Sequence, residues 1–199
     1  MSMTWQQQKS LATREKILRA ALTCLERDGF HHLSLIRVAN EAKVSKGALT
    51  HHFSSRDELI TQAMEVLLDE FVEKLRDAVD DVHSGKLSLE DCLDVIWQLM
   101  SDQLYMVTLE IALKSRHEAE FKSALTPLVS RFHRRLNDTW QQLFPELPSQ
   151  RAQSLMNLTM NLMRGMGTQS VFREDAAYFN GLLDTWKTIL RQQLKSTDA

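Results

Sequence analysis

The stretch SLIRVANEAKVSKGALTHHFSSRDELI, Ser34 to Ile60, holds two short segments with helical spacing on either side of a tight turn. Ser34 precedes the first segment, and a serine hydroxyl at such a position accepts a hydrogen bond from a first-turn amide. We therefore predict a helix from about Leu35 to Ala42. Its inward-facing residues are small, which lets a partner helix approach closely: Val38, Ala39 and Ala42.

The second segment begins after a turn at Lys43 and Val44, and Ser45 is placed to cap it. Leu49 and Phe53 are four residues apart, so they share one side of a helix and can hold it from behind. Two short helices joined by a turn of three or four residues have helix-turn-helix spacing. The positions left to face outward are Ser45, Lys46, Ala48, Thr50, His51 and His52.

A longer helix is predicted upstream, from about Thr13 to Asp28. Ile17, Ala21 and Leu25 repeat every four residues within it, which is the period of a buried helical stripe. Gly29 is placed to end this helix, because glycine adopts the left-handed conformation that commonly follows a helix.

The rest of the chain also alternates helical stripes with short breaks, and β-branched runs typical of strands are almost missing. Pro127 lies inside one stripe, so we expect a helix start near Thr126 or a kink there. The sequence predicts an all-α fold of about nine helices, with a helix-turn-helix domain over residues 10–56 and a second helical domain over 57–196. The later helices are expected from Ser54 or Ser55 to about His83, Ser88 to Met100, Tyr105 to Ser115, Glu118 to Phe144, Ser149 to Val171, and Glu174 or Asp175 to Leu194.

Charge is distributed unevenly along the chain. Residues 1–56 carry nine Lys and Arg against four Asp and Glu, a net charge of +5, whereas the whole chain has a net charge of −2. Four of the seven histidines also lie in this first part. A basic module beside an acidic remainder is typical of proteins that bind nucleic-acid phosphates, although chance asymmetry remains the alternative.

Composition excludes several other classes of protein. The chain is 43% hydrophobic and 25% charged, contains no apolar run of about 18 residues, and begins without an apolar signal core, so we expect a cytoplasmic protein. Cys24 and Cys92 form neither a disulfide framework nor a zinc set; we interpret both as buried, with a reactive thiol as the alternative. No Gly-rich phosphate loop, HExxH or activated nucleophile is evident, so we expect no enzyme, cofactor or metal.

The helix-turn-helix region resembles the DNA-binding signature of the tetracycline-repressor (TetR) family of bacterial regulators. The residues that carry the resemblance are Ser34, Val38-Ala39, Ala42, Val44-Ser45, Gly47, Leu49, His52-Phe53 and Arg56. Two positions depart from the family pattern. Lys43 stands where the family usually has glycine, which implies a left-handed lysine or an altered turn, and Thr50 stands where the family usually has tyrosine.

The resemblance implies that the second short helix enters the major groove of a DNA operator. Lys46 is then the expected reader of a guanine edge, and His52 corresponds to a histidine that contacts phosphate. Simpler interpretations remain open, with Ser34 and Ser45 as caps only and Lys46 and His52 as solvated surface residues. The expected DNA-binding residues are Ser34, Arg37, Ser45, Lys46, Ala48, Thr50, His51, His52 and Arg56.

The resemblance also implies a second domain that binds a small-molecule effector and forms a homodimer through its last two helices. Met156, Met160, Met163 and Met166 suit an adaptable pocket, but plain core packing explains them equally. Glu110, His133 and Arg164 are candidate polar anchors for the effector or, alternatively, surface and interhelical partners. The expected pocket residues are Phe71, Trp97, Met100, Leu104, Tyr105, Phe132, Trp140, Met160 and Met163. The expected dimer residues are Leu155, Leu158, Leu162, Met166, Phe179, Leu182, Leu183 and Trp186.

The function expected from this resemblance is sequence-specific transcriptional regulation. The hypothesis is a homodimeric, ligand-responsive repressor on a near-palindromic operator, in which the long fourth helix couples the two domains. The alternative is a helical interaction protein that has lost operator binding.

Overall fold

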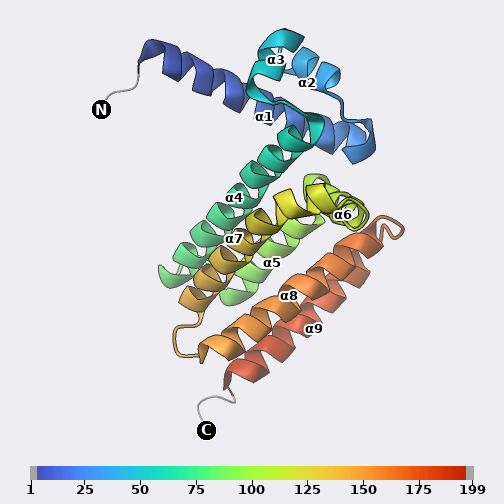
Figure 1. Ribbon diagram of the computed structural model, residues 1–199. Helices are drawn as coiled ribbons and strands as arrows, with labels where there is room; N and C mark the ends of the chain where they lie inside the picture. The colour runs from blue at the N-terminus through green and yellow to red at the C-terminus, as the bar shows by residue number, and fades with distance from the viewer. Residues whose placement is uncertain (1–3, 196–199) are drawn as a thin grey trace. The chain divides into compact units, whose positions relative to one another are not determined.

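The computed structural model describes residues 4–195, and this part of the chain forms nine α-helices and no strand (Figure 1). The all-α prediction is therefore confirmed. The described residues form two compact units: unit 1 contains residues 4–69 and 107–128, and unit 2 contains residues 70–106 and 129–195. The helices are α1 (Trp5–His32), α2 (Leu35–Glu41), α3 (Lys46–His52), α4 (Arg56–His83), α5 (Leu89–Ser101), α6 (Gln103–Ser115), α7 (Ala119–Leu143), α8 (Ser149–Ser170) and α9 (Ala176–Lys195).

Helix α1 begins eight residues earlier than its apolar stripe predicts. Thr4 and Gln7 form a reciprocal cap: the Gln7 amide donates to Thr4 Oγ1 at 3.3 Å, and the Thr4 amide donates to Gln7 Oε1 at 2.9 Å. Residues 4–12 are exposed on all sides, so no periodicity marks them in the sequence. Gly29 was expected to end this helix, and it leaves the helical conformation with φ 76° and ψ 170°, but α1 resumes after this kink and reaches His32.

The helix-turn-helix has the predicted caps and turn. The hydroxyls of Ser34 and Ser45 accept hydrogen bonds from the amides of Arg37 at 3.3 Å and Ala48 at 3.1 Å. Lys43 closes the turn with φ 50°, which confirms the left-handed lysine and costs about 1 kcal/mol relative to glycine. The Val44 amide donates to the Ala39 carbonyl at 3.0 Å and completes the turn.

Unit 1 is larger than the helix-turn-helix domain predicted over residues 10–56. Helices α2 and α3 lie against α1, as Figure 1 shows, and residues 107–128 add a further layer. Glu110 accepts a hydrogen bond from the Phe30 amide at 2.9 Å, and Lys114 pairs with Asp57 at 3.0 Å. The Phe30 ring also lies 6.5 Å from that of Phe121, so these contacts attach α6 and α7 residues to the end of α1.

In unit 2, helix α8 packs tightly against α5. A side chain at Gly167 would place its Cβ 3.0 Å from the Met100 carbonyl oxygen, tighter than most contacts, so this crossing favours glycine. The four α8 methionines, Met156, Met160, Met163 and Met166, are all buried, which favours the core-packing alternative for Met163 and Met166. Met156 and Met160 also line a cavity described below.

Helix α9 is attached to α5 and α8 by polar contacts at the edges of its apolar side. Lys187 Nζ pairs with Asp94 at 2.6 Å, and Arg191 pairs with Glu90. The Trp186 indole donates to Thr159 Oγ1 at 3.1 Å. Figure 1 shows α8 and α9 running side by side, and these bonds fix their packing.

Helix α7 runs through Pro127 from Ala119 to Leu143, so the predicted start near Thr126 is wrong. Proline cannot donate to the carbonyl one turn earlier, which belongs to Ser123. Ser123 is exposed, and water can satisfy that carbonyl without ending the helix.

Cys24 and Cys92 are buried free thiols, as predicted. Burial raises the pKa of the Cys92 thiol to about 11, which makes the reactive thiolate rare at neutral pH. Within residues 4–195, no helix combines the length and the apolar character that crossing a membrane requires.

Candidate functional site

Helix α3 has one buried side and one exposed side. Leu49 and Phe53 have no exposed surface and hold the helix against unit 1, as their four-residue spacing predicts. Lys46, Thr50 and His51 are exposed, whereas Ala48 is half-buried. A short helix that is packed on its buried side and exposed on its other side can enter a DNA groove.

The N-termini of α2 and α3 present amides and hydroxyls to solvent. Ser34 is half-buried and Ser45 is exposed, and each hydroxyl accepts a capping hydrogen bond while its own proton stays available. Helix N-termini favour anions because their first amides are unpaired and the helix dipole is positive there. Capping and phosphate contact are therefore compatible at both serines.

Two of the basic side chains predicted for this surface, Lys46 and Arg37, differ in their ion pairing. Lys46 makes no ion pair with any residue of the described chain. Arg37 pairs with Asp28 at 3.3 Å, and Asp28 also pairs with Arg27 at 3.0 Å. Hydrogen bonds from Arg27 are the largest cause that lowers the pKa of Asp28, which keeps the carboxylate charged and Arg37 oriented.

Thr50 and His52 face the same surface with limited hydrogen-bonding capacity. The Thr50 hydroxyl donates within α3, to the carbonyls of Lys46 at 3.1 Å and Gly47 at 3.2 Å, which leaves its methyl group for an apolar contact. Burial lowers the pKa of His52, and the neighbouring His51 and Arg14 lower it further. His52 is therefore neutral at pH 7 and offers one ring N–H.

Arg56 was expected to contact phosphate, but its guanidinium bonds within unit 1. Arg56 Nε donates to the Leu33 carbonyl at 2.8 Å, and Nη2 donates to the Phe30 carbonyl. The guanidinium also lies 4.5 Å from the centre of the Phe30 ring. These contacts join the end of α1 to the start of α4, which favours structural support over the expected phosphate contact for Arg56.

Arg14 is a neighbour of this surface that the sequence analysis did not single out. Its Nη2 donates to Gln62 Oε1 at 2.5 Å, and its guanidinium lies 5.8 Å from the centre of the Phe53 ring. The only sequence signal is its place one turn before Ile17 and Leu18, at the edge of the α1 stripe.

In unit 2, the predicted ligand-pocket residues do not form one cluster. The Phe71 ring lies 5.6 Å from that of Tyr105 and 5.7 Å from that of Phe132, so these three are together. Trp140 instead packs 5.2 Å from Phe144. Of the other predicted residues, Met100 and Met163 are fully buried, Leu104 is half-buried, and Trp97 and Met160 line two different cavities.

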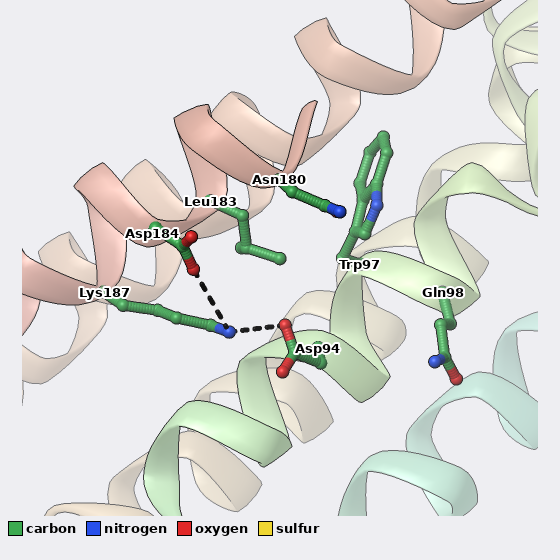
Figure 2. A pocket seen from close by; sticks show the side chains of 7 residues that line it. All are labelled: Asp94, Trp97, Gln98, Asn180, Leu183, Asp184 and Lys187. Atoms are coloured by element: carbon green, nitrogen blue, oxygen red, sulfur yellow. Dashed lines mark hydrogen bonds and ion pairs between the residues drawn. The ribbon is translucent and has the colours of Figure 1, made fainter. Parts of the chain in front are cut away.

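The first of these cavities is a groove of about 420 Å³ between α5 and α9. Figure 2 shows Lys187 extending between Asp94 and Asp184, and its Nζ lies 2.6 Å and 3.9 Å from their carboxylates. Trp97 forms another part of the groove and packs 5.7 Å from the Phe179 ring. The charges in this groove are therefore already paired with one another.

The second cavity, of about 120 Å³, lies between α7 and α8. Its polar side contains His133 and Arg164, two of the residues singled out as candidate polar anchors. The third candidate, Glu110, is not an anchor here, because it belongs to unit 1 and accepts the Phe30 amide.

Half of the predicted dimer residues are buried inside unit 2. Leu155, Met166, Phe179 and Leu183 are buried within the chain, which favours packing inside unit 2 over dimer contact for these four. Leu158 is 55% exposed, and the remaining three are half-buried: Leu162, Leu182 and Trp186.

Unit 1 thus presents a helix-turn-helix DNA-binding surface: a recognition helix fixed by apolar residues, two helix N-termini and a free lysine. Residues 17–63 match the family described as bacterial regulatory proteins, tetR family. This match assigns residues 17–63 to the DNA-binding domain of that family, and the chain is a DNA-binding transcriptional regulator rather than an enzyme.

Known proteins with similar sequence or structure agree with this assignment. The transcriptional regulator CymR of Pseudomonas putida is 24% identical over 197 residues, which cover 94% of each chain. The nicotine-responsive transcriptional repressor HdnoR of Paenarthrobacter nicotinovorans is 33% identical over 92 residues, covering 46% of this chain and 47% of HdnoR. A transcriptional regulator from Rhodococcus sp. Rha1 has the same fold, with a TM-score of 0.71, 18% identity, and coverage of 90% of this chain and 96% of that one.

Proposed function

We propose that this regulator is a cytoplasmic repressor that binds a near-palindromic operator as a homodimer and releases it when a small molecule binds unit 2. The observation that carries the DNA-binding part is the position of α3, which Leu49 and Phe53 fix while Lys46 stays exposed and unpaired within the described chain. HdnoR, whose name describes a ligand-responsive repressor, supports the direction of regulation.

The proposed DNA contacts divide into base reading and phosphate binding. Lys46 reads base edges, because an ammonium donor suits guanine O6 and N7 in the major groove. The Thr50 methyl contacts a thymine methyl, and the partly exposed Ala48 contributes apolar area at another side of the helix. Phosphates are bound by the remaining predicted residues other than Arg56, which are Ser34, Arg37, Ser45, His51 and His52.

Lys46→Ala is expected to weaken specific operator binding by about 1–3 kcal/mol and to leave the melting temperature unchanged. Fluorescence anisotropy with DNA from upstream of the protein's own gene measures the affinity. Lys122→Ala removes the same charge from an exposed position of unit 1 and serves as the control. Equal affinities for the two variants would contradict base reading by Lys46, and no binding by the unaltered protein would favour the interaction-protein alternative.

The proposed dimer surface is the outward side of α8 and α9. Leu158, Leu162, Leu182, Trp186 and Ile189 are exposed or half-buried there, and Ile189 is 41% exposed. No atom lies within 4 Å of a Cβ placed on Gly165, so a partner helix can approach closely. Two copies related by a two-fold axis can bury this apolar surface against each other.

Light scattering of the unaltered protein is expected to give twice the chain mass of 23.0 kDa. Leu158→Glu places a charge in the proposed interface and is expected to reduce the mass to that of one chain. Leu113→Glu is the control, because Leu113 is 68% exposed in unit 1, outside this surface. A Leu158→Glu protein that stays dimeric would remove α8 from the interface.

A further inference from the structure

The cavity between α7 and α8 has an apolar floor and a basic polar side. Leu136 of α7 and Met156 and Met160 of α8 are buried and form its apolar part. Its polar part comes from His133, Asn157, Asn161 and Arg164, and none of the lining residues is acidic. The cavity therefore combines an apolar surface with positive charge that no lining residue neutralises.

Arg164 is positioned at this cavity with most of its donors unused. Its Nη1 donates to Asn161 Oδ1 at 2.8 Å, and it forms no ion pair with another described residue. A half-buried guanidinium with a neutral amide as its partner can bind a carboxylate through two parallel N–H···O bonds. This is a stronger bond than the amide provides, so a carboxylate ligand completes the site.

His133 supplies a second donor on the opposite helix. Within residues 4–194 its ring nitrogens have no hydrogen-bond partner. Burial lowers the pKa of His133, and the positive charge of Arg164 lowers it further. The ring is consequently neutral at pH 7 and offers one N–H, and the cavity as a whole carries one positive charge, from Arg164. A monoanion offsets this charge.

We propose that this cavity binds a short-chain organic carboxylate, with its carboxylate on Arg164 and His133 and its alkyl chain on Leu136, Met156 and Met160. The volume of about 120 Å³ is smaller than the cavity of about 150 Å³ that holds benzene in another protein, so the ligand has about five to seven non-hydrogen atoms. That this carboxylate is the effector rests on the proposed function.

The larger groove between α5 and α9 does not have this character. Its lysine, Lys187, is held by Asp94 and Asp184, so a carboxylate entering there meets two acidic groups and no free cation. A negative charge added in this groove therefore serves as a control for the same charge added in the α7–α8 cavity.

The test is calorimetric titration of pentanoate into the full-length protein, with 1-pentanol and pentylammonium as probes of the same chain length. Pentanoate is expected to bind, and the alcohol and the amine at least tenfold more weakly, because charge-assisted hydrogen bonds contribute about twice as much as neutral ones. Equal affinity for pentanoate and 1-pentanol would overturn the proposal.

Asn161→Asp provides the matched variant, because it adds one negative charge, with an oxygen in place of the amide nitrogen, to a side chain that already accepts from Arg164. The new carboxylate is expected to pair with Arg164 and to weaken pentanoate binding about tenfold or more. Asn161 is exposed, so the fold is retained, and Asn180→Asp in the other groove is the control with the same added charge. Unchanged binding by Asn161→Asp would also overturn the proposal.

Operator binding is measured in a separate assay, so that the carboxylate site and the proposed repressor function can be refuted independently. Pentanoate that binds without releasing the operator would refute the effector role and leave the carboxylate site in place. A protein that binds pentanoate but no DNA would refute the proposed function and leave the site in place.

Discussion

Phe53→Ala is expected to lower the free energy of unfolding by about 3–5 kcal/mol, because it leaves a cavity where a fully buried ring was. Phe53 follows the last turn of α3, its amide donates to the Leu49 carbonyl at 2.9 Å, and its ring lies beneath the Arg14 guanidinium. Loss of the ring removes the support that orients α3. Unfolding in guanidinium chloride measures the free energy of unfolding. Amide hydrogen exchange is expected to place the loss of protection within residues 4–69.

The control for Phe53→Ala is His51→Ala, two residues earlier on the exposed side of the same helix. This variant is expected to change the free energy of unfolding by less than about 0.5 kcal/mol, as surface substitutions usually do. Similar losses in both variants would show that α3 depends on its own helical stability and is not held by contacts with α1.

Arg56→Gln is expected to lower the free energy of unfolding by about 2–4 kcal/mol, because the carbonyls of Phe30 and Leu33 lose a charged donor in a partly buried place. Arg56→Lys is expected to have a similar effect, since an ammonium lacks the fork that reaches both carbonyls. Denaturant titration measures both variants.

The change in stability on replacing Arg56 distinguishes a structural role of this arginine from a DNA-contact role. A phosphate-binding Arg56 would leave stability unchanged when replaced, and lysine would preserve operator affinity. Arg116→Gln removes an exposed arginine elsewhere in unit 1 and is expected to change the free energy of unfolding by less than about 0.5 kcal/mol.

The helix-turn-helix could be predicted from the sequence because its determinants are local. Ser34 and Ser45 cap helices that begin at the next residue, and Leu49 and Phe53 lie one turn apart. The left-handed Lys43 was one of two alternatives, because the family usually has glycine at this position and an altered turn would also have fitted the sequence. Each of these features depends on residues within a few positions of one another.

Long-range contacts could not be predicted in this way. The carbonyls that bind Arg56 lie 23 and 26 residues earlier in the chain, and Glu110 reaches Phe30 across 80 residues. A basic residue at a helix start looks the same in the sequence whether it meets phosphate or carbonyl oxygen.

The dimer and pocket residues could not be predicted reliably for a different reason. Helices α8 and α9 are apolar on more than one side, and periodicity does not show which side packs inside unit 2. Leu155 and Leu158 are both plausible from the sequence, but only Leu158 is exposed. His133 and Arg164 were recognised as candidate anchors, whereas their meeting at one cavity depends on how α7 packs on α8.

The contact at Gly167 has a mechanical consequence for unit 2. A Cβ at Gly167 would lie 3.0 Å from the Met100 carbonyl oxygen, so the α8 and α5 backbones approach each other closely there. Gly167 is three residues from Arg164, so a ligand bound to Arg164 lies close to this helix crossing. We expect α8 to tilt about this crossing when the ligand binds. The largest displacement of the helix is then expected at its end farthest from Gly167, near Ser149.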